Sequence, residues 1–197
     1  MSLSVLITGT LISRLPFPIL EDAQIINGLQ TIVSRDTELT KEAAVITVGL
    51  IRGGVRSNII PEEVKMIGTI RTLDYGMQDQ LNKIIKKRVP AIAEAFGGAA
   101  TIIIREGYPI TYNNHELTKQ MLPSLEKSAG KENVRLVDAV TGAEDFSYYQ
   151  QKVPGMYFFL GGKPLNVAKE KLASHHTPDF YLDESGFKLG VKTFVNL

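Results

Sequence analysis

The stretch at residues 53–72, GGVRSNIIPEEVKMIGTIRT, constrains the fold more than any other part of the chain. Its second half alternates apolar and polar side chains, with Val64, Met66 and Ile70 on one face, which is typical of a half-buried β-strand. The run just before it, AAVITVGLIR, is rich in β-branched residues and is also predicted to be a strand. We expect the two strands to form a hairpin whose connecting loop contains Asn58.

Strand and helix patterns alternate over the first 112 residues. Apolar residues recur at helical spacing near residues 25–33 and again over 78–96, and strands are predicted at 3–8 and 100–106. With the hairpin, the order becomes strand, helix, strand, strand, helix, strand, which matches a ferredoxin-like α/β sandwich. An exposed edge of such a sheet is free to pair with a second copy of the chain.

The pattern changes after residue 112, and we expect a second domain over residues 113–197. Its alternation of strand and helix is typical of part of a parallel α/β sheet. The sequence predicts only two strands in this domain, which are too few to enclose a core. We therefore expect this half either to lack a part or to pack on a partner. The predicted helices lie at residues 117–125, 144–151 and 187–195, and the predicted strands at 134–137 and at 156–160, where MYFFL indicates a buried strand.

Composition excludes several classes of protein. The 22 basic and 21 acidic residues give a net charge of +1 without a basic stripe, which argues against a nucleic-acid partner. Without cysteine the chain has no disulfide and no thiolate nucleophile. No apolar run approaches the roughly 20 residues of a membrane span, and no signal peptide is evident, so we expect a cytoplasmic protein without a membrane partner.

Asn58 and Arg71 are the polar groups of the hairpin that could bind a ligand. The guanidinium of arginine is a planar fork suited to a carboxylate, and the amide of asparagine both donates and accepts hydrogen bonds. The alternative is also open, in which Asn58 is a turn residue and Arg71 a solvated strand residue.

The second half contributes histidines and an acidic pair. His175 and His176 lie next to each other in ASHHTPDF, so one of them can bind a metal, although a zinc site needs three or four ligands. His115 starts a predicted helix and is expected at the surface. Glu144 and Asp145, in TGAEDF, either cap a helix or serve a site, where an acidic pair is suited to general acid–base chemistry.

Four motifs, in this order, resemble those of a zinc-dependent amidohydrolase and peptidase family that includes aminoacylases, hippurate hydrolases and indole-acetyl-amino-acid hydrolases. They are GGVRSNIIPEEVKMIGTIRT, TGAEDFSYY, YFFLGG and HHTPDF. In that family a ferredoxin-like lid or dimerisation domain interrupts an α/β catalytic domain. The resemblance therefore implies a lid or dimerisation domain at residues 1–112 and the carboxy-terminal remainder of a catalytic domain at 113–197.

The resemblance also implies roles for individual residues. Asn58 and Arg71 match positions that bind the substrate carboxylate, with Asn58 reaching into the partner subunit's site. Gly142 and Glu144 match positions that line the substrate. His176 matches the last ligand of the metal, which is zinc or another divalent ion in the complete enzyme. The substrate implied is an N-acyl amino acid or a small peptide, and the assembly implied is a homodimer.

Other features of the family are missing from this sequence. The chain has no counterpart of the catalytic half that supplies the remaining metal ligands and the glutamate general base. The stretch GTLISRLPFP, at residues 9–18, lacks the histidine that stabilises the oxyanion across the dimer in the family. We therefore expect this chain alone to contain no catalytic residue, to hold no metal stably and to be inactive. Two alternatives are a non-catalytic dimerisation or binding module and a regulatory amino-acid-binding domain, although the latter leaves HHTPDF unexplained.

Overall fold

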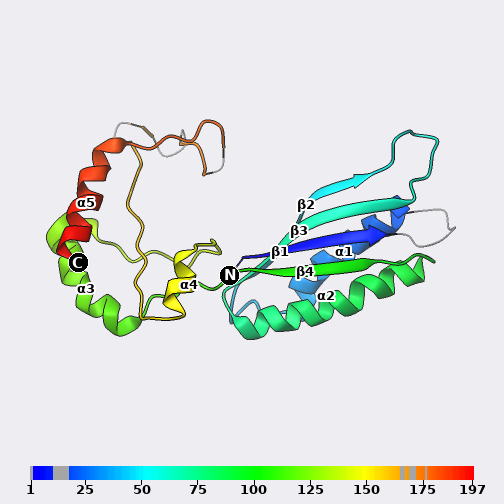
Figure 1. The fold of residues 1–197 in the computed structure, drawn as a ribbon, viewed down its shortest axis with the longest axis horizontal. Helices are drawn as coiled ribbons and strands as arrows, with labels where there is room; N and C mark the ends of the chain where they lie inside the picture. Colours follow the sequence, from blue (N-terminus) through cyan, green and yellow to red (C-terminus); the bar gives the residue numbers. More distant parts are fainter. Residues whose placement is uncertain (1, 11–17, 165–166, 169–171, 176) are drawn as a thin grey trace. The chain divides into compact units, whose positions relative to one another are not determined.

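The computed structural model describes residues 2–10, for which only the backbone is considered, and residues 18–164, 167–168, 172–175 and 177–197. The chain divides into two units (Figure 1). The first contains Met1–Thr111 together with Val140–Tyr148, and the second contains Tyr112–Ala139 and Tyr149–Leu197.

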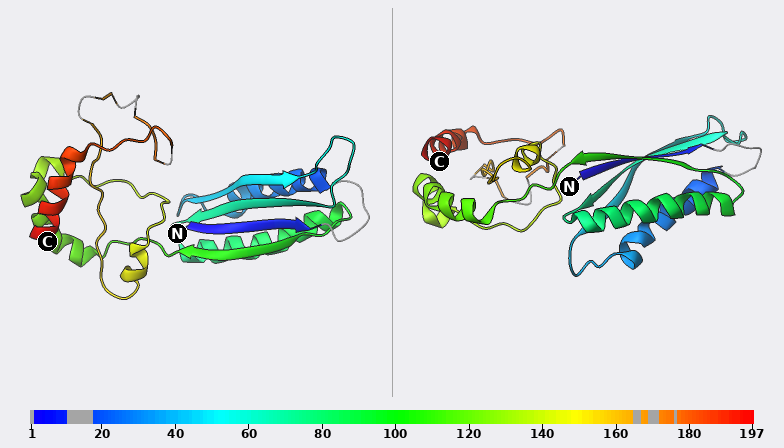
Figure 2. Two further views of the ribbon diagram at one scale, coloured as in Figure 1. Left: turned by 45° about the horizontal axis from the view of Figure 1, so that its top comes forward. Right: turned by 60° about the horizontal axis from the view of Figure 1, so that its bottom comes forward.

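The first unit is a four-stranded antiparallel sheet with two helices on one face (Figure 2). The strands lie in the order β2-β3-β1-β4. This is a mixed α/β architecture with a small antiparallel sheet, as the sequence predicts. Its elements are β1 (Ser2–Thr10), α1 (Pro18–Asp36), β2 (Ala44–Gly53), β3 (Glu63–Thr72), α2 (Tyr75–Ala95) and β4 (Thr101–Tyr108).

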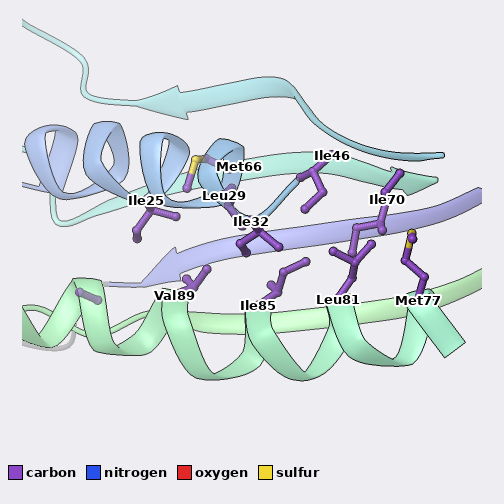
Figure 3. Close-up of a cluster of buried hydrophobic side chains, with 12 residues drawn as sticks. Ile25, Leu29, Ile32, Ile46, Met66, Ile70, Met77, Leu81, Ile85 and Val89 are labelled. Atoms are coloured by element: carbon purple, nitrogen blue, oxygen red, sulfur yellow. The ribbon is translucent and has the colours of Figure 1, made fainter. Parts of the chain in front are cut away.

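The core of the first unit lies between the sheet and its helices (Figure 3). Val64, Met66 and Ile70 of β3 are at most 2% exposed, so the predicted alternation of β3 is confirmed. The opposite face of the sheet has no helix over it and carries the remaining side chains of β3, among them Arg71. The main helix residues in the core are Ile25, Leu29, Ile32, Met77, Leu81, Ile85, Val89 and Ala93.

Local signals fix both ends of α2. The carboxylate of Asp74 accepts a hydrogen bond of 2.7 Å from the backbone N–H of Met77, which caps the first turn. After the helix, Gly97 takes a φ of 79°, a conformation that glycine adopts without the steric cost of a Cβ. The N–H of Gly98 then bonds to the carbonyl of Ala93 at 2.9 Å, so the glycine pair ends the helix as the sequence predicts.

The second unit is built from helices and extended segments. Its long helices are α3 (His115–Ala129) and α5 (Phe187–Asn196), with short 3-10 turns at Lys131–Asn133 and Glu184–Gly186. The short helix α4 (Phe146–Gln150) begins in the Val140–Tyr148 segment of the first unit. Among the described residues, no helix is both long enough and apolar enough to cross a lipid bilayer.

The strands predicted at residues 134–137 and 156–160 do not form, and this prediction is wrong. Neither segment is a helix or a strand, and neither pairs with another strand in the described part of the chain. Every strand in the described part of the chain belongs to the four-stranded sheet of the first unit. A segment becomes a strand only through hydrogen bonds to a neighbouring strand. Among the described residues, neither segment has such a neighbour.

Candidate functional site

Arg71 lies near the end of β3, on the sheet face that has no helices. It is opposite Val45 of β2 on one side and Ser2 of β1 on the other. Its side chain is half-buried, and its Nη1 donates a hydrogen bond of 3.0 Å to the carbonyl oxygen of Thr141. Arg71 makes no ion pair with any residue that the structure describes, so most of its guanidinium N–H groups remain available to a ligand.

The Val140–Tyr148 segment is held to the first unit at both ends. Arg71 binds it at Thr141, and near its other end the hydroxyl of Tyr148 donates to the carbonyl of Gly107 at 3.2 Å. The ring of Tyr148 also packs against that of Tyr108, with centroids 5.8 Å apart. The structure thereby brings the TGAEDF motif to the end of the sheet where Arg71 lies.

Gly142 and Glu144 lie between these two attachments. Gly142 is exposed, and a Cβ placed on it would meet only a methyl group of Val140, at 3.9 Å, so the backbone there is accessible. Glu144 is half-buried, and its carbonyl accepts hydrogen bonds from the backbone N–H and the hydroxyl of Ser147, at 3.2 and 2.6 Å. Of the residues predicted to hold substrate, the structure therefore brings Arg71, Gly142 and Glu144 to one region.

Asn58 is elsewhere in the first unit. It is exposed in the loop that joins β2 to β3, next to the pair formed by Gly53 and Val64. At about 3.3 Å per residue along β3, Val64 and Arg71 are separated by roughly 23 Å. Within one chain, Asn58 and Arg71 therefore do not form one site.

The metal ligand predicted from the sequence, His176, lies outside the described residues. Its neighbour His175 is exposed, with its ring centroid 4.6 Å from that of Phe180. No three His, Cys, Asp or Glu side chains in the described part lie close enough together to hold a metal ion. The described residues therefore do not provide a metal site by themselves.

Sequence reasoning missed two features. The acceptor for Arg71 is a backbone carbonyl, which no side-chain pattern reveals. The second feature is Asp22, which the sequence places in the first turn of a helix, where its charge would favour the helix dipole. In the structure Asp22 is 2% exposed beside the buried Glu21, and its Oδ2 has no hydrogen-bond partner among the described residues. Burial, with the nearby Glu21 charge, raises the pKa of Asp22 to about 7, and burial also raises the pKa of Glu21.

Several curated proteins that are similar to this chain carry the names of hydrolases. The chain is 36% identical to Thermostable carboxypeptidase 2 of Saccharolobus solfataricus over 174 residues, which is 88% of this chain and 43% of the relative. It is 34% identical to N-acetyldiaminopimelate deacetylase of Halalkalibacterium halodurans over 142 residues, or 71% of this chain and 37% of the relative. The chain thus spans less than half the length of the curated relatives it matches.

Solved structures share the fold. Bacillus subtilis YXEP, described as a dinuclear metal binding peptidase from the M20 family, matches with a TM-score of 0.67 and 24% identity, over 99% of this chain and 48% of that one. A tripeptidase from Staphylococcus aureus matches with a TM-score of 0.65 and 16% identity, over 99% and 49% of the two chains. The model of peptidase family M20/M25/M40 matches residues 10–197. The chain therefore belongs to this family of metal-dependent peptidases and amidohydrolases.

Proposed function

We propose that the complete protein is a metal-dependent hydrolase that cleaves the amide of N-acyl amino acids or small peptides. In this proposal the present chain holds the substrate and forms the dimer, and it is inactive alone because the hydrolytic centre needs groups from outside it. Residues 1–112 form a ferredoxin-like lid or dimerisation domain, and residues 113–197 belong to the catalytic domain. The protein acts in the cytoplasm. Family membership and relatives named carboxypeptidase and deacetylase support the reaction class.

The observation that carries this proposal is the position of Arg71. Among the described residues, its guanidinium makes one hydrogen bond, to the carbonyl of Thr141, and no ion pair. A carboxylate bound to the remaining N–H groups would lie beside Gly142 and Glu144, whose segment the same guanidinium holds. Arg71 would then orient the substrate, while the reaction itself takes place at the metal of the complete protein.

A pair of substrates tests the carboxylate role of Arg71. In the full-length protein, we expect Arg71→Ala to raise KM for an N-acetyl amino acid by about 10- to 100-fold, because a charge-assisted hydrogen bond contributes about 1.5–3 kcal/mol. The same variant should leave KM for the corresponding N-acetyl amino acid amide nearly unchanged, because that substrate lacks the carboxylate. Arg105→Ala, at an exposed position of β4, is the control. An equal loss with both substrates contradicts the proposal.

We propose that Asn58 acts across a homodimer. The loop that carries it is exposed and distant from Arg71 of the same chain, so Asn58 would contribute to the partner's site. The sheet supports dimerisation because β2 and β4 are edge strands with unpaired backbone groups. Light scattering at micromolar concentration should show a dimer, and a monomer over the whole concentration range rules this assembly out.

For the metal, we propose His176 as one ligand in the complete protein. Zinc, or another divalent ion, would polarise the amide carbonyl and activate water there. Inductively coupled plasma mass spectrometry should find less metal per full-length protein in His176→Ala, and unchanged metal in His175→Ala. Equal metal content in wild type and His176→Ala excludes His176 as a ligand.

A non-catalytic dimerisation module is the second candidate function. The observation that favours it is the pair of edge strands of the sheet, β2 and β4. Both candidates predict that the isolated chain does not hydrolyse N-acetyl or N-benzoyl amino acids in the presence of zinc, cobalt or manganese. They differ for the full-length protein, which hydrolyses these substrates only under the first proposal.

A further inference from the structure

Two tyrosine rings lie together in the first unit, outside its hydrophobic core. The ring centroids of Tyr108 and Tyr148 are 5.8 Å apart, and the ring planes are inclined by 60°. Tyr108 is 42% exposed and Tyr148 is 49% exposed, and neither belongs to the core between the sheet and its helices. We call these two side chains the tyrosine pair. It offers an aromatic surface that the described residues leave half uncovered.

The tyrosine pair borders the same area of the sheet as Arg71. Ser2 of β1 is paired with Arg71 on one side and with Tyr108 on the other, so the three residues form one row. Residues paired across neighbouring strands point to the same face, so Tyr108 and Arg71 both lie on the face without helices. Two strand spacings separate their backbones by roughly 10 Å. A small molecule bound to the guanidinium can therefore reach the tyrosine pair.

The Val140–Tyr148 segment fixes the second ring of the pair. Its Thr141 carbonyl accepts the hydrogen bond from Arg71, and the hydroxyl of Tyr148 donates to the carbonyl of Gly107 at 3.2 Å. The ring of Tyr148 is thus held at both ends, by its backbone and by its hydroxyl. A side chain that is already held loses little further conformational entropy when a ligand packs against it. The tyrosine pair is therefore a preorganised apolar surface beside a cation.

A guanidinium beside an aromatic surface suits a ligand that has both a carboxylate and an aromatic ring. The guanidinium binds the carboxylate through charge-assisted hydrogen bonds. Aromatic rings attract one another in offset or edge-to-face arrangements, and this attraction adds to the effect of burying their surface. In an N-acyl amino acid, a ring on the side chain or on the acyl group is only a few bonds from the carboxylate. Either ring can therefore pack against the tyrosine pair while the carboxylate is on Arg71.

We propose that Tyr108 and Tyr148 give the complete protein a preference for substrates with an aromatic ring, on the amino-acid side chain or on the acyl group. This inference rests on the proposed function, in which Arg71 binds the substrate carboxylate. The substrate then lies across the row that joins β3 to β4, and its ring packs against the tyrosine pair. The two tyrosines contact the substrate and determine specificity, and they transfer no proton.

Saturating the substrate ring tests this preference in the full-length protein. N-acetyl-phenylalanine is compared with N-acetyl-cyclohexylalanine, and N-benzoyl-alanine with its cyclohexanecarbonyl analogue. The members of each couple share a carbon skeleton and a carboxylate and differ in aromaticity. In at least one couple, we expect kcat/KM to be about 3- to 10-fold higher for the aromatic member, and that couple identifies the ring that is bound. Tyr108→Leu and Tyr148→Leu should each remove most of this preference.

Two further variants separate contact with the substrate from support of the segment. Tyr148→Phe loses the hydrogen bond to Gly107 but keeps the ring, so it should retain the preference. Phe96→Leu, at a 45% exposed position at the end of α2, is the control and should behave as wild type. The inference is overturned if wild type shows no preference in either couple. It is also overturned if Tyr148→Leu lowers kcat/KM equally for both members of a couple, which is the result of a structural role alone.

A binding measurement separates this inference from the proposed reaction. In the full-length protein, NMR signals of the Tyr108 and Tyr148 rings are followed as N-acetyl-phenylalanine or N-acetyl-cyclohexylalanine is added. The ring current of the aromatic ligand should shift both signals, the saturated ligand should shift them much less, and Arg71→Ala should require at least tenfold more ligand for the same shift. Shifts without hydrolysis of any substrate would refute the proposed reaction and leave the aromatic preference in place. Binding that depends on Arg71 but moves neither tyrosine signal overturns this inference alone.

Discussion

The guanidinium of Arg71 and the carbonyl oxygen of Thr141 are joined by a hydrogen bond of 3.0 Å across 70 residues of sequence. Arg71 lies in the row of the sheet that also contains Ser2 of β1 and Tyr108 of β4. Tyr108 in turn packs against Tyr148, so one row of the sheet holds both ends of the Val140–Tyr148 segment. The residue proposed to bind substrate thus also fixes the position of a neighbouring backbone segment.

Removing this hydrogen bond should loosen the segment without unfolding the first unit. For Arg71→Ala we expect faster amide exchange at residues 142–144 and a loss in unfolding free energy of about 0.5–1.5 kcal/mol, the usual contribution of one hydrogen bond. Arg105→Ala should change neither quantity. Unchanged exchange at 142–144 in Arg71→Ala would show that Tyr148 alone holds the segment.

The buried carboxyl of Asp22 should make stability fall as pH rises. Its pKa is about 7 in the folded protein and 3.8 for the free group, so the folded state retains a proton that the unfolded state has lost over this range. The stabilising effect is complete below pH 4 and is lost as the pH rises through 7. Asp22→Asn should therefore be more stable than wild type at pH 8, by on the order of 2 kcal/mol.

Urea unfolding at pH 4.5 and pH 8 measures this effect. The advantage of Asp22→Asn should be smaller at pH 4.5, where the wild-type carboxyl is protonated in the folded state. Asp79→Asn, at an exposed position, should differ from wild type by no more than about 0.5 kcal/mol at either pH. An Asp22→Asn variant equally stable to wild type at both pH values would contradict the raised pKa.

Two glycines in neighbouring strands should respond differently to alanine. A Cβ on Gly68 of β3 would overlap the backbone carbonyl oxygen of Thr47, whereas a Cβ on Gly49 of β2 has nothing within 4 Å. Because backbone in a paired strand cannot easily move, Gly68→Ala should cost about 1–3 kcal/mol. Gly49→Ala should stay within about 0.5 kcal/mol, and thermal unfolding of both variants checks the difference.

The ion pair between Arg88 and Asp36 should stabilise the contact between α1 and α2. Both guanidinium nitrogens Nη1 and Nη2 reach the carboxylate, at 2.8 and 3.1 Å, and the two side chains are only about 30% exposed. A double-mutant cycle should give a coupling energy of about 1 kcal/mol, falling with added salt. The exposed pair of Lys83 and Asp79 within α2 should give a coupling energy of about 0.3–0.5 kcal/mol. Equal coupling energies for the two pairs would show that the two-nitrogen contact and partial burial of the Arg88–Asp36 pair add no stability.

The sequence predicted the first unit well because local patterns there agree with the contacts that form. Val64, Met66 and Ile70 alternate, and these residues face two helices of the same unit. The pattern at residues 156–160 is equally apolar, but a strand also needs a neighbour, which no property of MYFFL supplies. The same limit applies to Asp22, whose burial depends on how α1 packs rather than on its place in the helix.

The candidate site was predictable in its residue types and not in its arrangement. Arg71 could be chosen because guanidinium suits a carboxylate, and TGAEDF because of the family resemblance. That the two lie together depends on a main-chain carbonyl 70 residues away, which leaves no trace in side-chain chemistry. His176 lies outside the described residues, so its role as a metal ligand stays a prediction.

The uneven distribution of buried side chains has a consequence for the lifetime of the chain in a cell. The aromatic side chains of Phe194 and Phe159 are still 72% and 59% exposed after folding. Chaperones and proteases recognise such surface, and degradation follows the least protected part of a molecule rather than its average. We therefore expect the abundance of this polypeptide to depend on how quickly its second unit is covered after synthesis, however stable the sheet of the first unit is.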